Sequence, residues 1–364
     1  MQSDVAIIGG GPAGCAAALT LLGRNVSVAV IAAPHHKRRP TETATPALRQ
    51  LLRSLNASEA LAACEPCYGI VSAWGNNSPA LRPAIADPNG HAWFIERADF
   101  DKSLRNAVRK RGGTWITDEA RHIAIDAEGV LIRTKTKLVR ARWAVIATGS
   151  PASAARLTAQ KVKQVDSLVA FWAQIQGQLQ ERLLFVEPSD QGWWYLSPRG
   201  HATTACFITD PFSARSLSPS KPFAWNRLFQ ATKLSHKLQG DQLPEQIHVA
   251  LTGLALLPEK HGPRWIAIGD AAAKLDPLGS SGTTTGIDSG QRAAHAVADA
   301  LQSNTAALDR YVRWSTGLVE EFTRQRRQQY AMEAQHQSDS FWSRRLMGSS
   351  TKPRKSPYLI TAKP

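Results

Sequence analysis

A glycine-rich turn near the N-terminus constrains the fold of this 364-residue chain more than any other feature. Its glycines follow the spacing G-x-G-x-x-G over residues 9–14. An apolar run of strand length, residues 5–8, precedes the turn, and an alanine- and leucine-rich stretch of helical character, residues 15–22, follows it. A second run, residues 26–31, is rich in β-branched side chains. This order of strand, turn, helix and strand predicts the start of a parallel sheet in an α/β fold.

The same turn predicts a dinucleotide site. Gly9 permits the tight turn, Gly11 lets the backbone approach a pyrophosphate, and Gly14 lets the helix pack closely on the strand. The start of the helix offers backbone amides and a positive dipole end to the phosphates. The residues expected to bind the cofactor here are Gly9, Gly11, Pro12, Ala13 and Gly14.

One part of that site is missing from the sequence. The acidic residue that ordinarily follows the second strand and binds the adenosine ribose should stand near position 32, which is Ala32. The ribose must then be anchored from elsewhere, for example by backbone groups or by the basic run His35–Arg39. That run could equally be a solvated loop.

A second motif lies more than 250 residues further along the chain. An apolar run at residues 265–268 is followed by a Gly-Asp pair, and a loop rich in proline and glycine covers residues 276–282. An aspartate after a strand can accept hydrogen bonds from ribityl hydroxyls, and the helix after the loop can face a flavin with its N-terminal amides. The two motifs together favour FAD over NAD. The residues expected at this end of the site are Thr148, Gly149, Gly269, Asp270, Pro277, Gly279 and Gly282.

Composition limits the partners and the location. Lysine and arginine number 44 against 29 aspartate and glutamate, a formal net charge of +15. Such a charge attracts nucleic acid, anionic lipid or acidic protein surfaces, but no nucleic-acid recognition motif accompanies it, so nucleic acid is not an expected partner. Residues 5–23 are uncharged, yet the Gly-Gly-Gly-Pro interruption at residues 9–12 argues against a membrane span, so a cytoplasmic location is the default.

The four cysteines do not predict a metal site. Cys64 and Cys67 have the spacing of a redox pair or of half a zinc site, but no second pair and no histidine cluster completes a set of ligands. We therefore expect incidental thiols.

Several segments resemble the FAD-dependent aromatic hydroxylase and tryptophan-halogenase superfamily. Residues 41–46, leading into Arg49, look like its GES-x-PP … LL segment. Residues 93–101 are similar to its DR-x-x-FD segment, whose arginine, here Arg97, lies against the FAD. Residues 192–198 keep part of its GW-x-W-x-IP strand. The resemblance adds Glu42, Arg49 and Arg97 to the expected cofactor site.

A narrower branch is indicated by the ending Phe-Trp-Ser-Arg-Arg at residues 341–345, together with residues 72–75 and 276–282. These look like the modifying flavoproteins that accompany quinohemoprotein amine dehydrogenase, lysine ε-oxidase or glycine oxidase. The resemblance implies an FAD-dependent monooxygenase that hydroxylates a tryptophan side chain of a partner oxidase precursor during tryptophylquinone biogenesis. It also implies O₂ as co-substrate, and NAD(P)H or a separate flavin reductase as electron source.

The expected architecture is an α/β protein with a discontinuous Rossmann-like FAD-binding domain of the hydroxylase or glutathione-reductase type. An antiparallel-sheet substrate domain is inserted into it, since residues 166–257 alternate apolar stretches with turn residues. The C-terminus is expected to be helical. The predicted boundaries are residues 1–68, 97–165 and 258–302 for the FAD-binding domain, 69–96 and 166–257 for the substrate domain, 303–348 for the helical region and 349–364 for a flexible tail.

Two alternative functions stay open. One is a small-molecule FAD hydroxylase or halogenase acting on free tryptophan or another aromatic ring. The other is a non-catalytic flavoprotein chaperone that helps an oxidase precursor to mature. Halogenases of the superfamily need a lysine between the first long helix and the arginine segment, and no lysine occurs here between Lys37 and Lys102.

No catalytic acid or base is predicted, because an electron-rich indole depends less on a strong general base than a benzoate does. Glu42 and Asp276 stand at positions expected to flank the flavin, where positioning, solvated and capping roles are all open.

Candidates for contact with the substrate or the partner come from two segments. Trp93 and Trp194 are candidates for the substrate face, and because Trp193 and Trp194 are adjacent on a strand, at most one of those two can face the flavin. Arg344 and Arg345 belong to a basic, aromatic C-terminal region suited to a protein rim.

Overall fold

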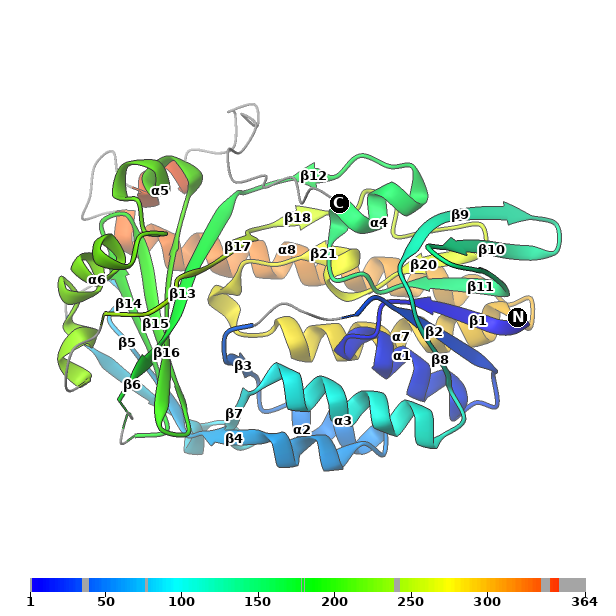
Figure 1. Cartoon of the computed structure of the whole chain (residues 1–364), viewed down its shortest axis with the longest axis horizontal. Helices are drawn as coiled ribbons and strands as arrows, with labels where there is room; N and C mark the ends of the chain where they lie inside the picture. The colour runs from blue at the N-terminus through cyan, green and yellow to red at the C-terminus, as the bar shows by residue number, and fades with distance from the viewer. Residues whose placement is uncertain are drawn as a thin grey trace. The chain divides into compact units, whose positions relative to one another are not determined.

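A computed structural model describes residues 2–34, 39–75, 78–177, 179, 181–238, 243–334 and 341–346. Its helices and strands are drawn in Figure 1. The chain separates into two compact units. Unit 1 comprises residues 1–70, 82–163 and 255–323, and unit 2 comprises residues 71–81, 164–254 and 324–364.

The main sheet of unit 1 has eight strands. They are β1 (Gln2–Ile8), β2 (Val28–Ala32), β8 (Thr114–Thr117), β9 (Ala120–Asp126), β10 (Gly129–Thr134), β11 (Leu138–Ile146), β19 (His261–Gly262) and β20 (Trp265–Ala267). Six of them follow the order β19-β20-β11-β1-β2-β8, and the β9–β10 hairpin joins beside β11. The pairs β20–β11, β11–β1, β1–β2 and β2–β8 are parallel, so their carboxyl ends meet at one edge.

Both faces of this sheet are covered, which explains why its strands read as continuous apolar runs. Val5 and Ile7 belong to a core with the helices of one face, whereas Ala6 and Ile8 belong to a core on the other face. The helices of unit 1 are α1 (Pro12–Leu22), α2 (Leu48–Ser54), α3 (Arg97–Lys110), α4 (Pro151–Thr158) and α7 (Gly282–Ala300), with the 3-10 helices η1 (Ser58–Ala63), η2 (Ala84–Ala86), η4 (Gly269–Ala271) and η5 (Pro277–Gly279). In Figure 1 the helices α1, α3 and α7 lie on the same side of β1.

Two short sheets complete unit 1. One has the order β3-β7-β4 and consists of β3 (Glu42–Ala44), β7 (Ala92–Ile95) and β4 (Cys64–Cys67), all antiparallel. The other has the order β12-β18-β21 and consists of β12 (Lys163–Gln164), β18 (Ala255–Leu256) and β21 (Ala273–Lys274). The first sheet matters for function, because pairing of β3 with β7 brings Glu42 opposite Ile95, just before α3.

Unit 2 is built on a seven-stranded sheet with the order β17-β13-β16-β15-β14-β5-β6. Its strands are β5 (Gly69–Ser72), β6 (Ala80–Pro83), β13 (Leu168–Gln176), β14 (Leu184–Ser189), β15 (Gly192–Arg199), β16 (Ala202–Thr209) and β17 (His248–Thr252). The pairs from β17 to β14 are antiparallel. The helices are α5 (Pro211–Leu217), α6 (Pro222–Gln230), η3 (Lys233–Lys237) and α9 (Phe341–Leu346), and the unit boundary falls within α8 (Ala306–Ala334).

The predicted α/β fold, with its discontinuous first domain, antiparallel sheet and helical C-terminus, is confirmed. The two compact units divide the chain differently from the predicted domains, most clearly at two segments. Residues 82–96 fall in unit 1, because β7 pairs with β3 and β4, and residues 303–323 fall in unit 1 as well. The predicted tail at residues 349–364 lies outside the described residues.

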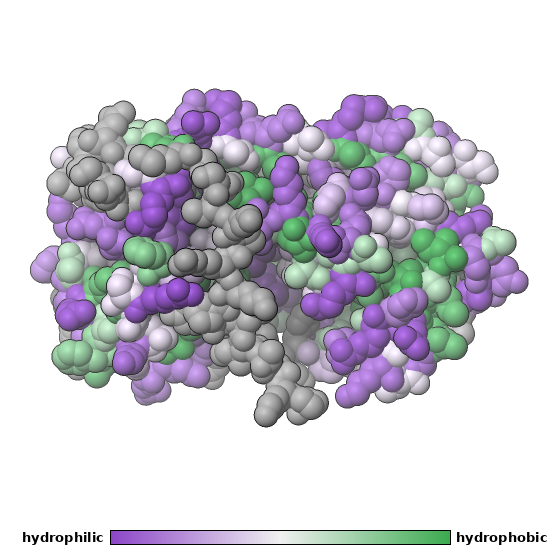
Figure 2. Space-filling model, turned by 90° about the horizontal axis from the view of Figure 1, so that it is seen from above, coloured by the Kyte–Doolittle hydropathy of each residue, from purple (hydrophilic) through white to green (hydrophobic). Residues whose placement is uncertain are grey.

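Hydrophilic residues are spread over the face seen in Figure 2, with hydrophobic residues between them in small areas. Among the residues that the structure describes, none of the helices is long and apolar enough to cross a membrane.

Candidate functional site

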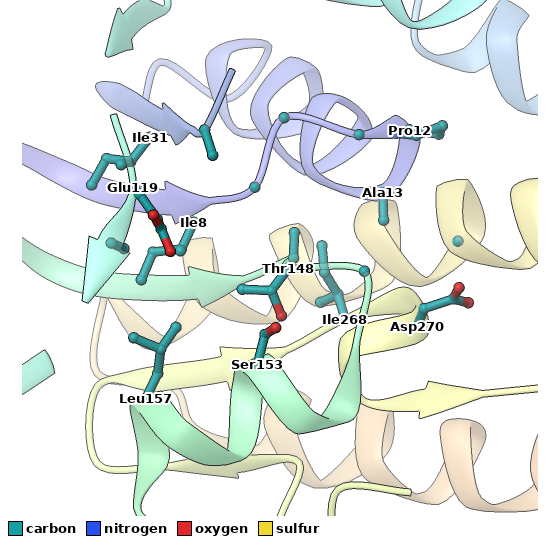
Figure 3. A pocket seen from close by; sticks show the side chains of 18 of the residues that line it. Ile8, Pro12, Ala13, Ile31, Glu119, Thr148, Ser153, Leu157, Ile268 and Asp270 are labelled. Atoms are coloured by element: carbon teal, nitrogen blue, oxygen red, sulfur yellow. The ribbon is translucent and has the colours of Figure 1, made fainter. Parts of the chain in front are cut away.

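A pocket of about 520 Å³ opens in unit 1 at the carboxyl ends of the parallel strands. It is lined by residues 8–13 of the glycine turn, by 118–121 after β8, by 147–149 after β11, and by residues of η4 and of the start of α7. Figure 3 shows Glu119 and Leu157 toward one end of this pocket, Asp270 toward the other, and Thr148 and Ser153 between them. Ligands of open parallel sheets ordinarily bind at this edge.

The three motif glycines have different reasons to be glycine. Gly9 has a φ of +121°, and a Cβ added to it would lie 2.1 Å from the carbonyl oxygen of Ala147. A Cβ at Gly14 would lie 2.0 Å from the carbonyl oxygen of Gly9. A Cβ at Gly11 would meet nothing closer than Nη2 of Arg97 at 4.0 Å. The fold therefore requires the first and third glycines, whereas Gly11 leaves an open space in the pocket wall that a ligand can occupy.

Helix α1 begins at this open space. Gly11 is its N-cap and Pro12 its first residue, no side chain caps it, and no acidic residue stands in its first turn. Its first-turn amides therefore point toward the pocket without a side-chain partner, as a pyrophosphate requires. Helix α7 fixes the position of α1, because a Cβ at Gly290 would lie 2.3 Å from the carbonyl oxygen of Ala13.

A buried charge cluster forms the wall beside Gly11. Arg97 donates from Nη1 to Glu42 Oε1 at 2.8 Å, and from Nε and Nη2 to the two carboxylate oxygens of Asp101 at 2.9 and 3.0 Å. The other oxygen of Glu42 accepts from the Thr283 hydroxyl at 2.8 Å. Burial alone would raise the pKa of Glu42, but Arg97, Arg39 and Thr283 outweigh burial, so its pKa lies below the usual value. Glu42 and Arg97 are thus held ionised at the pocket.

Asp270 stands at the far end of the pocket, after β20. Its position is fixed by the preceding residue, since the Gly269 amide donates to the Ser289 hydroxyl at 2.9 Å. Burial raises the pKa of Asp270, and Lys274 only partly offsets this effect. A carboxyl group in this position can accept hydrogen bonds from sugar-alcohol hydroxyls.

The structure brings together most of the residues predicted to bind the cofactor. Those that line the pocket are Gly9, Gly11, Pro12, Ala13, Glu42, Arg97, Thr148, Gly149, Asp270 and Gly282. Gly14 and Gly269 instead shape the backbone around α1. Pro277 and Gly279 form η5, away from the lining residues, and Asp276 is a cap, accepting from the Leu278 amide at 2.9 Å.

Arg49 and Trp93 do not line the pocket. The Arg49 guanidinium lies 5.1 Å from the Trp93 ring centroid, and its Nη2 lies 3.0 Å from Nε2 of His91. The planar cation of Arg49 is thus used in stacking, and its place in the cofactor site stays a prediction.

Trp194 is a core residue of unit 2, not a substrate-facing one. Its ring stacks on Phe207 at 4.9 Å and meets Trp225 edge-on at 5.0 Å. Since neighbouring side chains alternate, Trp193 points to the other face of the sheet, and its buried indole nitrogen has no hydrogen-bond partner among the described residues.

Arg344 and Arg345 are tied into unit 2. Arg345 donates from Nη1 to Asp210 at 3.0 Å and its Nε lies 3.3 Å from Asp166. Arg344 reaches the same oxygen of Asp210 at 3.0 Å. Phe341 of the same helix is fully buried. The C-terminal motif thus anchors α9 in unit 2, and its role as a partner-binding rim stays a prediction.

The two paired cysteines are ordinary thiols here. Cys64 and Cys67 are both reduced thiols on β4, and they donate to the carbonyl oxygens of Ala60 and Gly69. Burial raises the pKa of Cys64 to about 12, which makes it unreactive at neutral pH.

Several lining residues were not predicted, namely Asp118, Glu119, Arg121, Ser153, Arg156, Leu157 and Thr283. Most follow β8 or belong to α4, and no motif marks them. For the residues after β8, only the position of β8 beside β2 could have suggested a place in the pocket.

Known proteins with similar sequences and structures are consistent with a dinucleotide site in this pocket. The sequence profile of the family described as pyridine nucleotide-disulphide oxidoreductase matches residues 3–183. LodB of Marinomonas mediterranea, named as an FAD-dependent oxidoreductase, is 25% identical over 360 residues, which cover 94% of this chain and 96% of LodB.

The chain is an enzyme similar to the FAD-dependent oxidoreductases. Two solved structures share the fold of this flavoenzyme. QhpG, described as a peptidyl tryptophan dihydroxylase essential for tryptophylquinone cofactor biogenesis, has a TM-score of 0.78 and 19% identity, covering 97% of this chain and 80% of QhpG. CmlS, a flavin-dependent halogenase, has a TM-score of 0.85 and 21% identity, covering 95% of this chain and 67% of CmlS. The predicted resemblance to the fold of flavin-dependent hydroxylases and halogenases is confirmed.

The pocket suits FAD on structural grounds. The open side of Gly11 and the uncapped start of α1 match a pyrophosphate, and Asp270 matches a ribityl chain. The ionised Glu42–Arg97 pair lines the same pocket.

Proposed function

We propose that this flavoenzyme is a monooxygenase that hydroxylates a tryptophan side chain in a partner oxidase or dehydrogenase precursor, as a step toward a tryptophylquinone cofactor. The observation that carries the proposal is the similarity to QhpG along nearly the whole chain, combined with a pocket whose residues fit FAD. The segments at residues 72–75, 276–282 and 341–345, which resemble the modifying flavoproteins, support the same branch.

The reaction balances as follows. One atom of O₂ replaces the hydrogen of an indole C–H bond as a hydroxyl group, and the other leaves as water. Two electrons and two protons are consumed, with NAD(P)H or a separate flavin reductase as the proposed reductant. FAD, when bound, supplies the oxygen activation.

The chain's own residues hold and orient the cofactor. The amides at the start of α1 bind the pyrophosphate beside Gly11, and Asp270 accepts from ribityl hydroxyls. Glu42 fixes Arg97 at the pocket wall through its 2.8 Å hydrogen bond, so the arginine keeps one orientation during the reaction. Preorganised charge of this kind needs no rearrangement when charge develops on a bound group.

A protein substrate is supported by one segment of unit 2. Residues 211–237 contain five lysines and arginines and no aspartate or glutamate. Phe212 of α5 is 71% exposed and Phe223 of α6 is 79% exposed, which is unusual for aromatic side chains. Exposed aromatic rings among cations suit an acidic partner surface. We therefore propose residues 211–237 as the docking segment.

The test is co-expression with a candidate oxidase precursor, followed by peptide mass analysis of the precursor. The proposal expects the mass of one or more oxygen atoms on a tryptophan peptide, and none when Gly11→Leu replaces the wild type. An unmodified precursor that nevertheless binds tightly would support the chaperone alternative instead.

The second candidate function is halogenation of an aromatic ring, which the likeness to CmlS favours. The absence of lysine between Lys37 and Lys102 weighs against it. Turnover in excess bromide with reduced FAD distinguishes the two. Brominated free or peptidyl tryptophan would support halogenation, and hydroxylated product without bromine would support the proposed function. The cytoplasmic location remains a prediction.

A further inference from the structure

The end of the pocket beside β2 lacks the carboxylate that the motif predicts, because Ala32 closes that strand. The next strand in the sheet, β8, runs parallel to β2 and places Thr117 opposite Ala32. The chain that leaves β8 therefore passes the same edge, and residues 118–121 line the pocket there. Any carboxylate that serves this end must come from that turn or from outside the described residues.

Asp118 fixes the turn, and both oxygens of its carboxylate accept hydrogen bonds from the protein. Its amide donates to the carbonyl oxygen of Ala32 at 3.0 Å, which ties the turn to the tip of β2. Its carboxylate accepts from the Thr134 hydroxyl at 2.6 Å, from the Thr136 hydroxyl and amide at 2.5 and 3.1 Å, and from the Glu119 amide at 2.7 Å. Asp118 thus has a structural role, and its hydrogen bonds also fix the backbone of Glu119.

Glu119 presents its side chain to the pocket from this fixed backbone. Its carbonyl oxygen accepts from the Lys135 amide at 2.9 Å, so the residue is held on both sides. Its side chain is 48% exposed, and Arg121 Nη2 lies 2.8 Å from Oε2. Figure 3 shows Glu119 beside Ile31 and Ile8, at the ends of β2 and β1. A carboxylate there can accept hydrogen bonds from the paired hydroxyls of a ribose.

We propose that Glu119 is the ribose-binding carboxylate of this pocket and recognises the adenosine half of FAD from β8 instead of β2. The proposal concerns cofactor recognition, so it holds whether the substrate is a protein or a small molecule. Its competitor is a ribose that carries a phosphate, which Arg121 and Arg156 in the same lining would attract. The two ideas predict opposite effects of removing the Glu119 charge.

The experiment titrates apoprotein with FAD and with FMN, which lacks the adenosine, using flavin fluorescence. Glu119→Ala should weaken FAD binding about tenfold, the value of one charge-assisted hydrogen bond, and leave FMN binding unchanged. Glu128→Ala is the matched control, because Glu128 lies on the β9–β10 hairpin, pairs with an arginine and does not line the pocket. It should change neither ligand by more than about twofold.

A rescue variant makes the assignment specific. Ala32→Glu restores the missing carboxylate at the ordinary position, so in the Glu119→Ala background it should bring FAD binding back to within about threefold of wild type. The melting temperature of the apoprotein should be the same in all variants, while the rise caused by FAD should shrink only in Glu119→Ala.

Three results would overturn the proposal. FAD binding by Glu119→Ala within twofold of wild type, or tighter, would show that the carboxylate does not hold the ribose. An equal loss for FMN would place the effect away from the adenosine. Failure of Ala32→Glu to rescue would show that the two positions do not serve the same group. None of these results depends on whether tryptophan is the substrate.

Discussion

Two buried arginines, one in each unit, are each held by two carboxylates, and of the two only Arg97 lines the pocket described above. In unit 1 the pocket cluster joins Arg97 to Glu42 and Asp101, and in unit 2 the anchor cluster joins Arg345 to Asp166 and Asp210. The side chains of Arg97 and Arg345 are 9% and 6% exposed. Arg97 and Arg345 are thus similarly buried and similarly paired with carboxylates, so neither property distinguishes a functional arginine from a structural one.

The difference lies in what fills the remaining space around each guanidinium. The nearest atom to the open side of Gly11 is Nη2 of Arg97, so that cation faces a volume that the protein leaves empty. The Arg345 guanidinium lies 3.8 Å from the centroid of the Phe341 ring of its own helix. A charge beside an open volume can act on a ligand, whereas a charge covered by an aromatic ring holds the chain together.

The largest expected effect comes from removing each arginine in turn. Arg97→Met should lower the free energy of unfolding by about 3 kcal/mol, since it leaves the buried Asp101 carboxylate without its arginine, and Arg345→Met should lower it less, since Arg344 and Arg326 still pair with Asp210 and Asp166. Only Arg97→Met should also weaken FAD binding, by at least about thirtyfold. Urea unfolding and FAD titration measure the two effects. Equal loss of FAD binding in Arg345→Met would erase the distinction between the clusters.

A side chain that fills the open volume beside Gly11 should weaken FAD binding without changing the stability of the protein. Gly11 has a φ of −81° and a ψ of −176°, a conformation open to any residue, so Gly11→Leu should fold normally. Its side chain would occupy the place of the pyrophosphate and weaken FAD binding more than about a hundredfold. The matched control is Gly317→Leu on α8, which also meets nothing within 4 Å and does not line the pocket. FAD titration of both proteins is the measurement, and similar affinities would refute the site.

Lowering the pH should reduce the contribution of the anchor cluster to the free energy of unfolding. Burial would raise the pKa of Asp210, but Arg345, the Ser213 amide and Arg344 outweigh burial and lower it. A lowered folded-state pKa means that the unfolded chain binds the proton first, so this stability is present above the ordinary pKa of 3.8 and is lost as the pH falls through the folded value. Asp210→Asn should be less stable than wild type near neutral pH, and the gap should narrow on acidification below about pH 4. Urea unfolding across this range tests the sign, and a gap that widens in acid would contradict it.

The docking segment should give the smallest of these effects. Phe212→Ala with Phe223→Ala should raise the concentration of precursor needed for half-maximal modification about tenfold, since exposed aromatic anchors dominate such contacts. Stability and FAD affinity should not change, because both rings are exposed. The control pair is Ile85→Ala with Leu138→Ala, two exposed apolar residues of unit 1. If both pairs behave alike, residues 211–237 are not the docking segment.

The sequence made unit 1 predictable because its signals are local. The glycine turn lies between its own strand and helix, and residues 9–14 are read without knowledge of the rest of the chain. Residue 97 also stood in a motif, so its place at the pocket followed from the resemblance. The charge at Glu119 was not predictable in this way, since it depends on which strand lies beside β2.

Unit 2 was harder to predict because its contacts join distant segments. Arg345 meets Asp166 and Asp210 across more than 130 positions, and nothing near the C-terminus indicates those partners. The alternation along β15 showed that Trp193 and Trp194 diverge, but not which one faces the aromatic core. That choice was settled by Trp225 and Phe229 of α6.

The most direct test of the proposed function is a competition under isotopically heavy O₂. FAD-loaded protein, a reductant, free tryptophan and the purified oxidase precursor are mixed at equal substrate concentrations, and both substrates are analysed by mass spectrometry. A docked protein uses remote contacts to place one indole, whereas free tryptophan has no such contacts. We expect heavy oxygen on one tryptophan of the precursor and little or none on the free amino acid. Heavy oxygen on free tryptophan with an unlabelled precursor would contradict the account.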